Sequence, residues 1–159
     1  IDYPRGRLIL ELPDSTAVRA SGAITLPMWL AGDHFILARG RIGAAPEAMM
    51  FIDTGLAGPM FTAPESTLRE AGIGISGSSY EGVSGGGPIK VTPVEAKFIA
   101  LGPLEAHDVT GLAHAFPPSL ERRFGFRIGG LISHGFLRPY AVTFDFVRME
   151  MTLVRQGMR

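Results

Sequence analysis

The chain has 159 residues, of which 46% are hydrophobic, and its 15 basic residues balance 15 acidic ones. A chain of this length forms one domain with a substantial core, and balanced charge without a basic block argues against nucleic acid as a partner. The absence of cysteine excludes disulfides and thiolate metal sites, and no apolar run reaches the length that spans a membrane.

The first half of the chain alternates between turn and strand signals. Residues 13–15 are typical of a turn or linker. Strands are expected at residues 23–30 and 34–42, with a hairpin turn at residues 31–33 between them. Residues 44–46 then break the chain before the next strand.

An apolar strand that ends in an acid lies at the centre of this pattern. The short run Met49–Ile52 is typical of a buried strand, and Asp53, Thr54 and Gly55 follow it directly. A carboxylate at the end of a buried strand is costly unless something binds or uses it. Gly55 permits a sharp turn, and the amides after it can donate to the carboxylate. This layout predicts an acid held at the floor of a cleft, with an ordinary turn residue as the alternative.

A short helix is expected after this turn. Thr62 can cap it, Glu65 can reach back to the cap, and Pro64 lacks an amide that the first turn would leave unpaired. The helix should extend to about Ala71 and end at Gly72.

The second half predicts more strands and turns. Tyr80–Val91 has the pattern of a hairpin with a glycine-rich tip. A helical turn is expected at residues 119–123, and a short helix at residues 134–137 that stops near Pro139. Further strands are expected at residues 94–101, 106–112, 127–132, 141–146 and 149–154. About ten strands with two short helices predict an all-β fold, a closed or partly closed β-barrel.

Three motifs, in this order, resemble those of the retropepsin-like aspartic protease family. The first is Asp53-Thr54-Gly55 after its apolar strand, and the second is the glycine-rich stretch Gly82–Val91. The third is Ile128–Leu137, where an apolar pair precedes a short segment that ends in Phe-Leu. Their spacing is similar to that of one retropepsin lobe across residues 20–155, either as the bacterial single-lobe type or as one lobe of a tandem protein. The resemblance implies a barrel of the acid protease type.

The resemblance also implies roles for individual residues. Asp53 would be the catalytic carboxylate, Thr54 would bond the matching loop of a partner lobe, and Gly55 would leave room for substrate. The residues expected to contact the substrate are Leu56 and Ala57 beside the cleft, and Gly85, Gly86 and Gly87 at the tip of a mobile flap. The implied activity is that of an aspartic endopeptidase, which hydrolyses a peptide or protein substrate with activated water and needs no metal or cofactor.

Such a protease needs two aspartates, yet this chain has one Asp-Thr-Gly and no Asp-Ser-Gly. The second aspartate would come from a homodimer mate or from a lobe upstream in the same chain. A strand–turn–strand repeat favours the upstream lobe, because Ile1–Leu10 and Phe144–Leu153 share Asp, Arg and Leu in register.

In the family such a segment closes a lobe. We therefore assign residues 1–12 to a terminal strand that ends a preceding lobe, and residues 13–159 to the retropepsin-like lobe, with self-pairing expected for this lobe in isolation. An ordinary N-terminal strand is the alternative. A start at Ile1 without a signal peptide is expected for a piece of a longer protein.

Two positions depart from the family pattern. Leu56 and Ala57 follow Asp-Thr-Gly, where the family has a small residue and then a hydroxyl or carboxylate, and Ser133 replaces a glycine. Both changes favour altered specificity or weak activity. The alternative function is a catalytically silent lobe that binds peptides or pairs with its neighbour.

Overall fold

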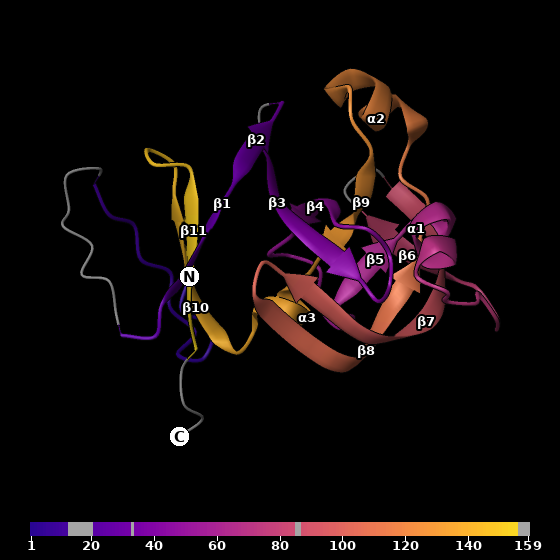
Figure 1. The fold of residues 1–159 in the computed structure, drawn as a ribbon, viewed down its shortest axis with the longest axis horizontal. Helices are drawn as coiled ribbons and strands as arrows, with labels where there is room; N and C mark the ends of the chain where they lie inside the picture. The colour runs from indigo at the N-terminus through magenta and orange to yellow at the C-terminus, as the bar shows by residue number, and fades with distance from the viewer. Residues whose placement is uncertain (13–20, 33, 85–86, 156–159) are drawn as a thin grey trace.

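The computed structural model describes residues 1–12, 21–32, 34–84 and 87–155, which form two β-sheets and three short helices (Figure 1). In chain order, the elements are β1 (Ile24–Pro27), β2 (Trp29–Ala31), β3 (Phe35–Ile42), β4 (Ala48–Ile52), β5 (Phe61–Ala63), α1 (Glu65–Glu70), β6 (Tyr80–Ser84), β7 (Gly87–Leu101), β8 (Leu104–Ala113), α2 (Pro118–Phe124), β9 (Ile128–Ile132), α3 (His134–Leu137), β10 (Tyr140–Asp145) and β11 (Glu150–Arg155). Among these residues, no helix combines the length and the apolar character needed to cross a membrane.

The larger sheet bends into a partly closed ring. Its strand order is β2-β3-β4-β9-β5-β8-β7-β6, and an additional pairing joins β3 to β7. Gly40 pairs with Leu101 at this closure, and a Cβ at Gly40 would lie only 2.7 Å from the carbonyl oxygen of Ala100. Glycine therefore allows the two backbones to approach. The predicted all-β, partly closed barrel is confirmed, and the helical turn predicted at residues 119–123 is the short helix α2.

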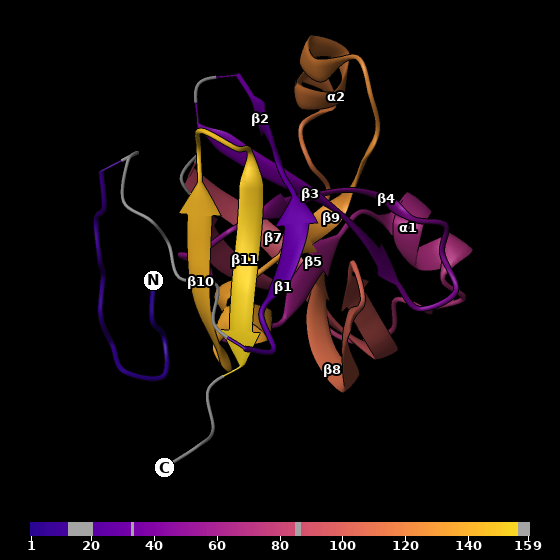
Figure 2. The same cartoon turned by 60° about the vertical axis from the view of Figure 1, so that its left-hand side comes forward.

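The smaller sheet has the order β1-β11-β10 and stands beside the ring (Figure 2). The strand predicted at residues 23–30 is divided between the two sheets. Its first part, β1, pairs with β11, and its second part, β2, pairs with β3. The prediction of one strand was wrong, because the chain changes partners at Met28, which is 1% exposed.

The helix predicted after the central turn is α1, but its predicted cap was wrong. Thr62 lies inside β5, where it pairs with Leu131 and Leu112 and is not available as a cap. Pro64 takes the N-cap position without a side-chain hydrogen bond. The predicted end at Gly72 is confirmed, since this glycine adopts a φ of 71°.

The second strand of the hairpin predicted at residues 80–91 and the strand predicted at residues 94–101 form one continuous strand, β7. β7 pairs with β6 through Gly87–Val91 and with β8 from Thr92 onward, so Pro93 lies just beyond the change of partner. A proline without an N–H is tolerated there because β6 no longer needs the bond. The glycine-rich hairpin is confirmed, although its tip residues Gly85 and Gly86 lie outside the described residues.

Both faces of β4 are buried, which explains its continuous apolar run. Met50 and Ile52 belong to the main core, whereas Phe51 belongs to a second cluster with Leu37 and Ile128. Phe35, Phe116 and Phe124 pack against this second cluster. Because side chains alternate along a strand, the residue after Ile52 continues on the face of Phe51.

Candidate active site

Asp53 lies at the end of β4, where the parallel strand β9 also ends. The Asp53 amide donates to the carbonyl oxygen of Ile132 at 2.9 Å, which fixes the acid to a strand that is fully buried at that point. The Asp53 side chain itself is half-buried. The predicted position of the acid at a buried strand end is therefore what the structure shows.

A tight turn holds the carboxylate. Asp53 Oδ1 accepts hydrogen bonds from the amides of Gly55 at 2.7 Å and Leu56 at 3.2 Å. A Cβ at Gly55 would lie 3.3 Å from this oxygen, so glycine permits the approach. Both of these bonds go to Oδ1, and Oδ2 accepts no hydrogen bond from the described residues.

The other predicted residues are divided between two parts of the fold. Thr54 and Ala57 are exposed in the Asp53 turn, and Leu56 is half-buried. Gly87 lies on the separate β6–β7 hairpin, where it opposes Ser84 at the base of the glycine-rich tip. The structure thus brings together the residues from Asp53 to Ala57, and the remaining tip glycines, Gly85 and Gly86, lie outside the described residues.

No pattern in the sequence indicates that Tyr3 lies at this site. The Tyr3 ring packs against the His134 ring with centroids 4.9 Å apart. Its hydroxyl is buried beside Thr54 and Asp53, without reaching the geometry of a hydrogen bond to any described residue. Burial raises the pKa of the Tyr3 hydroxyl and the negative charge of Asp53 adds to this, while the Thr54 hydroxyl acts in the opposite direction.

This proximity gives a prediction about ionisation. Asp53→Asn should lower the pKa of Tyr3, because removing a nearby negative charge makes the phenolate less unfavourable. The pH titration of the Tyr3 ring carbon, followed by NMR and assigned with Tyr3→Phe, measures this shift. Asp108→Asn, which removes an exposed carboxylate on β8, is the control and should leave the titration unchanged. An unchanged Tyr3 titration in Asp53→Asn would show that the two side chains do not interact.

Ser133 joins α3 to the segment that follows the Asp53 turn. Its hydroxyl caps α3 by accepting from the Gly135 amide at 3.1 Å, and it also donates to the carbonyl oxygen of Pro59. Its backbone amide donates to Met60 at 3.0 Å. The serine is fully buried, so the departure from glycine at this position has a structural use.

Removing this hydroxyl should destabilise the fold. Ser133→Ala loses the cap and leaves the Pro59 oxygen without its buried donor, so we expect a loss of about 1–3 kcal/mol in the free energy of unfolding. Urea unfolding measures it, with the exposed Ser119→Ala on α2 as the control. Equal stability of the two variants would contradict this role of Ser133.

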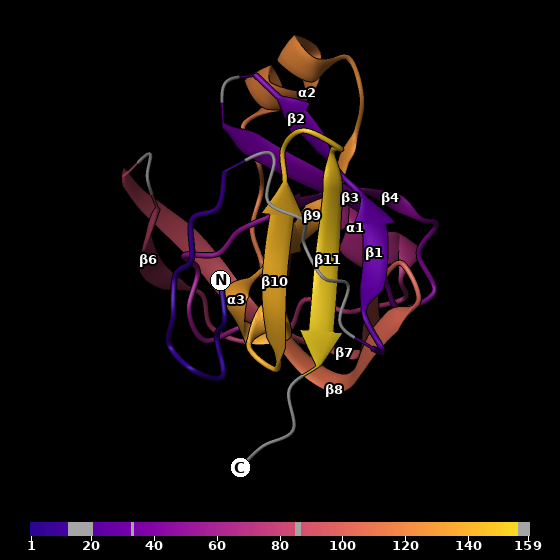
Figure 3. The ribbon, with the colours of Figure 1, turned by 90° about the vertical axis from the view of Figure 1, so that its left-hand side faces the viewer.

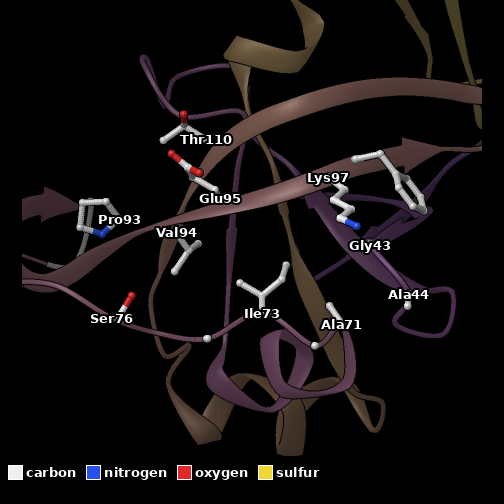
Figure 4. A pocket seen from close by; sticks show the side chains of 13 residues that line it. Gly43, Ala44, Ala71, Ile73, Ser76, Pro93, Val94, Glu95, Lys97 and Thr110 are labelled. Atoms are coloured by element: carbon white, nitrogen blue, oxygen red, sulfur yellow. The ribbon is translucent and has the colours of Figure 1, made fainter.

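A cavity of about 790 Å³ lies elsewhere, between β7 and the segment after α1 (Figure 4). Val94 and Ile73 line its apolar part, and Glu95 and Lys97 are its charged residues. No residue of the Asp53 turn lines it. We place the candidate site at Asp53, because there two backbone amides orient a carboxylate at a strand end. Within the described part of the chain, His, Asp and Glu side chains form no group of three that could hold a metal ion.

Comparison with known proteins identifies the fold. No family model matches the chain, and no curated protein matches it. Among solved structures, the chain is similar to a retropepsin-like aspartic protease from Rickettsia conorii, with a TM-score of 0.54 and 14% sequence identity over 83% of this chain and 90% of that one. At this identity the likeness concerns the fold, and the chain has the fold of a retropepsin-like aspartic protease.

Proposed function

We propose that this chain is a lobe of an aspartic endopeptidase and that Asp53 is one of its two catalytic carboxylates. The observation that carries the proposal is the Asp53 turn, in which two amides hold Oδ1 and leave Oδ2 open at the end of a buried strand. The retropepsin-like fold supports it, and in this chain the turn directly follows β4, which pairs parallel with β9.

The chemistry requires a second carboxyl group. Two carboxylates about 3 Å apart cannot both ionise, so the pair shares one proton and provides a base and an acid together. The charged member takes a proton from water while the water oxygen attacks the peptide carbonyl carbon. The protonated member gives its proton to the carbonyl oxygen. The C–N bond then breaks as a proton passes to the nitrogen, which yields a carboxylic acid and an amine.

The partner group would come from a second lobe, upstream in the same chain or in a homodimer mate. The exposed Thr54 hydroxyl is suited to bond the matching turn of that lobe. In this arrangement residues 1–12 end a preceding lobe, and residues 13–159 form the retropepsin-like lobe. The substrate would lie extended across the Asp53 turn, in contact with Leu56 and Ala57, while the glycine tip at Gly85, Gly86 and Gly87 closes over it.

A catalytically silent lobe is the second candidate. The observation that favours it is the pair Leu56 and Ala57, which offers neither a hydroxyl nor a carboxylate beside Asp53. Such a lobe would bind an extended peptide or pair with its neighbour without hydrolysis.

Cleavage of an unfolded protein distinguishes the two candidates. The full-length polypeptide and residues 1–159 are each incubated with the substrate between about pH 3 and pH 7, a range that includes the acid values at which carboxyl pairs of this kind share a proton. New peptide ends are identified by mass spectrometry. An endopeptidase generates internal cuts that a transition-state analogue suppresses. A full-length protein that binds the peptide but produces no cuts at any pH would support the silent lobe.

A further inference from the structure

We infer that Ile1–Leu12 is the closing hairpin of another lobe of this same fold, located upstream in the same polypeptide, and that Leu8 and Leu10 belong to the core of that lobe. The inference rests on the proposed function and deepens it, because it identifies the partner lobe and distinguishes it from a second copy of this chain.

The N-terminal hairpin has the same turn as β10–β11. Asp2 pairs with Arg7 across four turn residues, as Asp145 pairs with Glu150 across four. In each turn the Asp carboxylate accepts from the backbone and side chain of the Arg three residues on. These distances are 3.2 and 3.0 Å for Asp2, and 2.8 and 2.8 Å for Asp145.

The backbone of the two turns agrees as well. The residue before each closing pair has a positive φ, 60° at Gly6 and 55° at Met149. Met149 is a non-glycine residue in a conformation that such residues seldom adopt. The same unusual turn at the same register in both segments supports duplication of one element.

The two aspartates also share their electrostatics. Burial raises the pKa of the Asp2 carboxyl, but hydrogen bonds from Arg5 and Arg7 outweigh it and hold the pKa below its ordinary value. The backbone and side chain of Arg148 lower the pKa of Asp145 in the same direction. Each carboxylate therefore stabilises its turn in the charged form.

Burial differs between the segments that follow the two turns, of which only β11 is a strand in this structure. Met151 and Leu153 in β11 are 0% and 1% exposed, whereas their counterparts Leu8 and Leu10 are 71% and 88% exposed. Because they are two residues apart, Leu8 and Leu10 would lie on one face of this segment if it formed a strand. Since their counterparts fill a core, this exposed face has the pattern of a strand that has lost its own core.

The N-terminal segment contacts this lobe through Ile1 and Asp2. Ile1 and Val142 exchange backbone hydrogen bonds of 2.6 and 2.7 Å, and Asp2 pairs with Ala141, so the segment extends the smaller sheet beyond β10 (Figure 3). By the repeat, Ile1–Asp2 is the counterpart of the end of β10. Two equivalent strands that pair antiparallel are related by a local two-fold axis, as in the contact of two like subunits.

A second copy of this chain cannot receive the exposed leucines. Its own Met151 and Leu153 fill the core position, and its own Ile1 and Asp2 occupy the edge of β10. Only a lobe that lacks a closing strand of its own has this position open. The lobe that precedes Ile1 in the chain meets this condition, because Ile1–Leu12 is then its closing hairpin.

Thermal unfolding of the full-length polypeptide and of residues 1–159 tests the inference. Leu8→Ser with Leu10→Ser should lower the melting temperature of a lobe in the full-length protein by about 10 °C or more, as expected for two core leucines. The same pair should change that of residues 1–159 by less than about 2 °C, as expected for surface positions. The matched pair Met151→Ser and Leu153→Ser should destabilise both proteins, and Leu8→Ala with Leu10→Ala serves if the serine pair does not fold.

Three results would overturn the inference. They are an unchanged melting temperature of the full-length Leu8 and Leu10 variant, a full-length protein with a single lobe, and a dimer of residues 1–159 that the serine pair dissociates. None of these measurements depends on cleavage. The tandem arrangement can therefore be tested even if the lobe is catalytically silent. A homodimer that cleaves peptides would contradict the tandem arrangement but would support the proposed peptidase activity.

Discussion

Asp53→Asn is expected to lower peptide cleavage at acid pH by about 10³-fold or more, while the fold is retained. Asparagine has the same shape as aspartate, and its Oδ1 can still accept from the amides of Gly55 and Leu56. It cannot take a proton from water or share one with a second carboxyl group. The change therefore removes the chemistry and keeps the turn.

The design of this experiment depends on a matched control. Asp108→Asn makes the same substitution at an exposed position on β8, where the φ of 51° is one that asparagine also adopts. Its cleavage rate should equal that of the wild type. Cleavage that survives Asp53→Asn at the wild-type rate would show that Asp53 is not the catalytic acid, whatever the fold.

The position of Asp53 could be predicted because its signals are local. A short apolar run sets the strand, the acid marks its end, and Gly55 marks the turn, all within eight residues. The structure adds the reason for the glycine, whose missing Cβ leaves room for Oδ1. The turn at Gly102, which has a φ of 55°, was also predictable because its signal is local.

The predictions that were wrong concern segments whose structure depends on strands far along the chain. One apolar segment became β1 and β2 because β11 and β3 compete for its two ends, and no signal within residues 23–30 shows this. Thr62 has the chemistry of a helix cap, yet it lies in β5 and pairs with β8 and β9. Tertiary pairing outweighed local propensity in both cases.

The side chains that lie near Asp53 could not be predicted from the sequence either. Tyr3 lies fifty residues before Asp53, and His134 lies far after it, but the packing of the N-terminal hairpin brings their rings together. The repeat indicated the register of the N-terminal hairpin but not which of its side chains lies near the acid.

The second large effect is expected from Gly130→Ala, which should cost about 3 kcal/mol or more in the free energy of unfolding. A Cβ at Gly130 would lie 2.6 Å from the carbonyl oxygen of Thr62 and 2.8 Å from Cε of Met50. Met50 can adjust its side chain, but the Thr62 oxygen belongs to the backbone of β5, which is held between β8 and β9. The strands must therefore separate to admit one methyl group.

This strain would reach the Asp53 turn, because Gly130 lies on the strand that fixes it. β9 pairs with β4 through Met50 and Gly130, and two residues later Ile132 accepts the hydrogen bond of the Asp53 amide. Urea unfolding gives the loss of stability, with Gly74→Ala as the control, since a Cβ there meets no atom within 4 Å. Gly130→Ala should also reduce cleavage under conditions where it remains folded, because a shift of β9 moves the acid. Wild-type stability of Gly130→Ala would show that β5 and β9 can separate without cost, and that the position of Asp53 does not depend on their close contact.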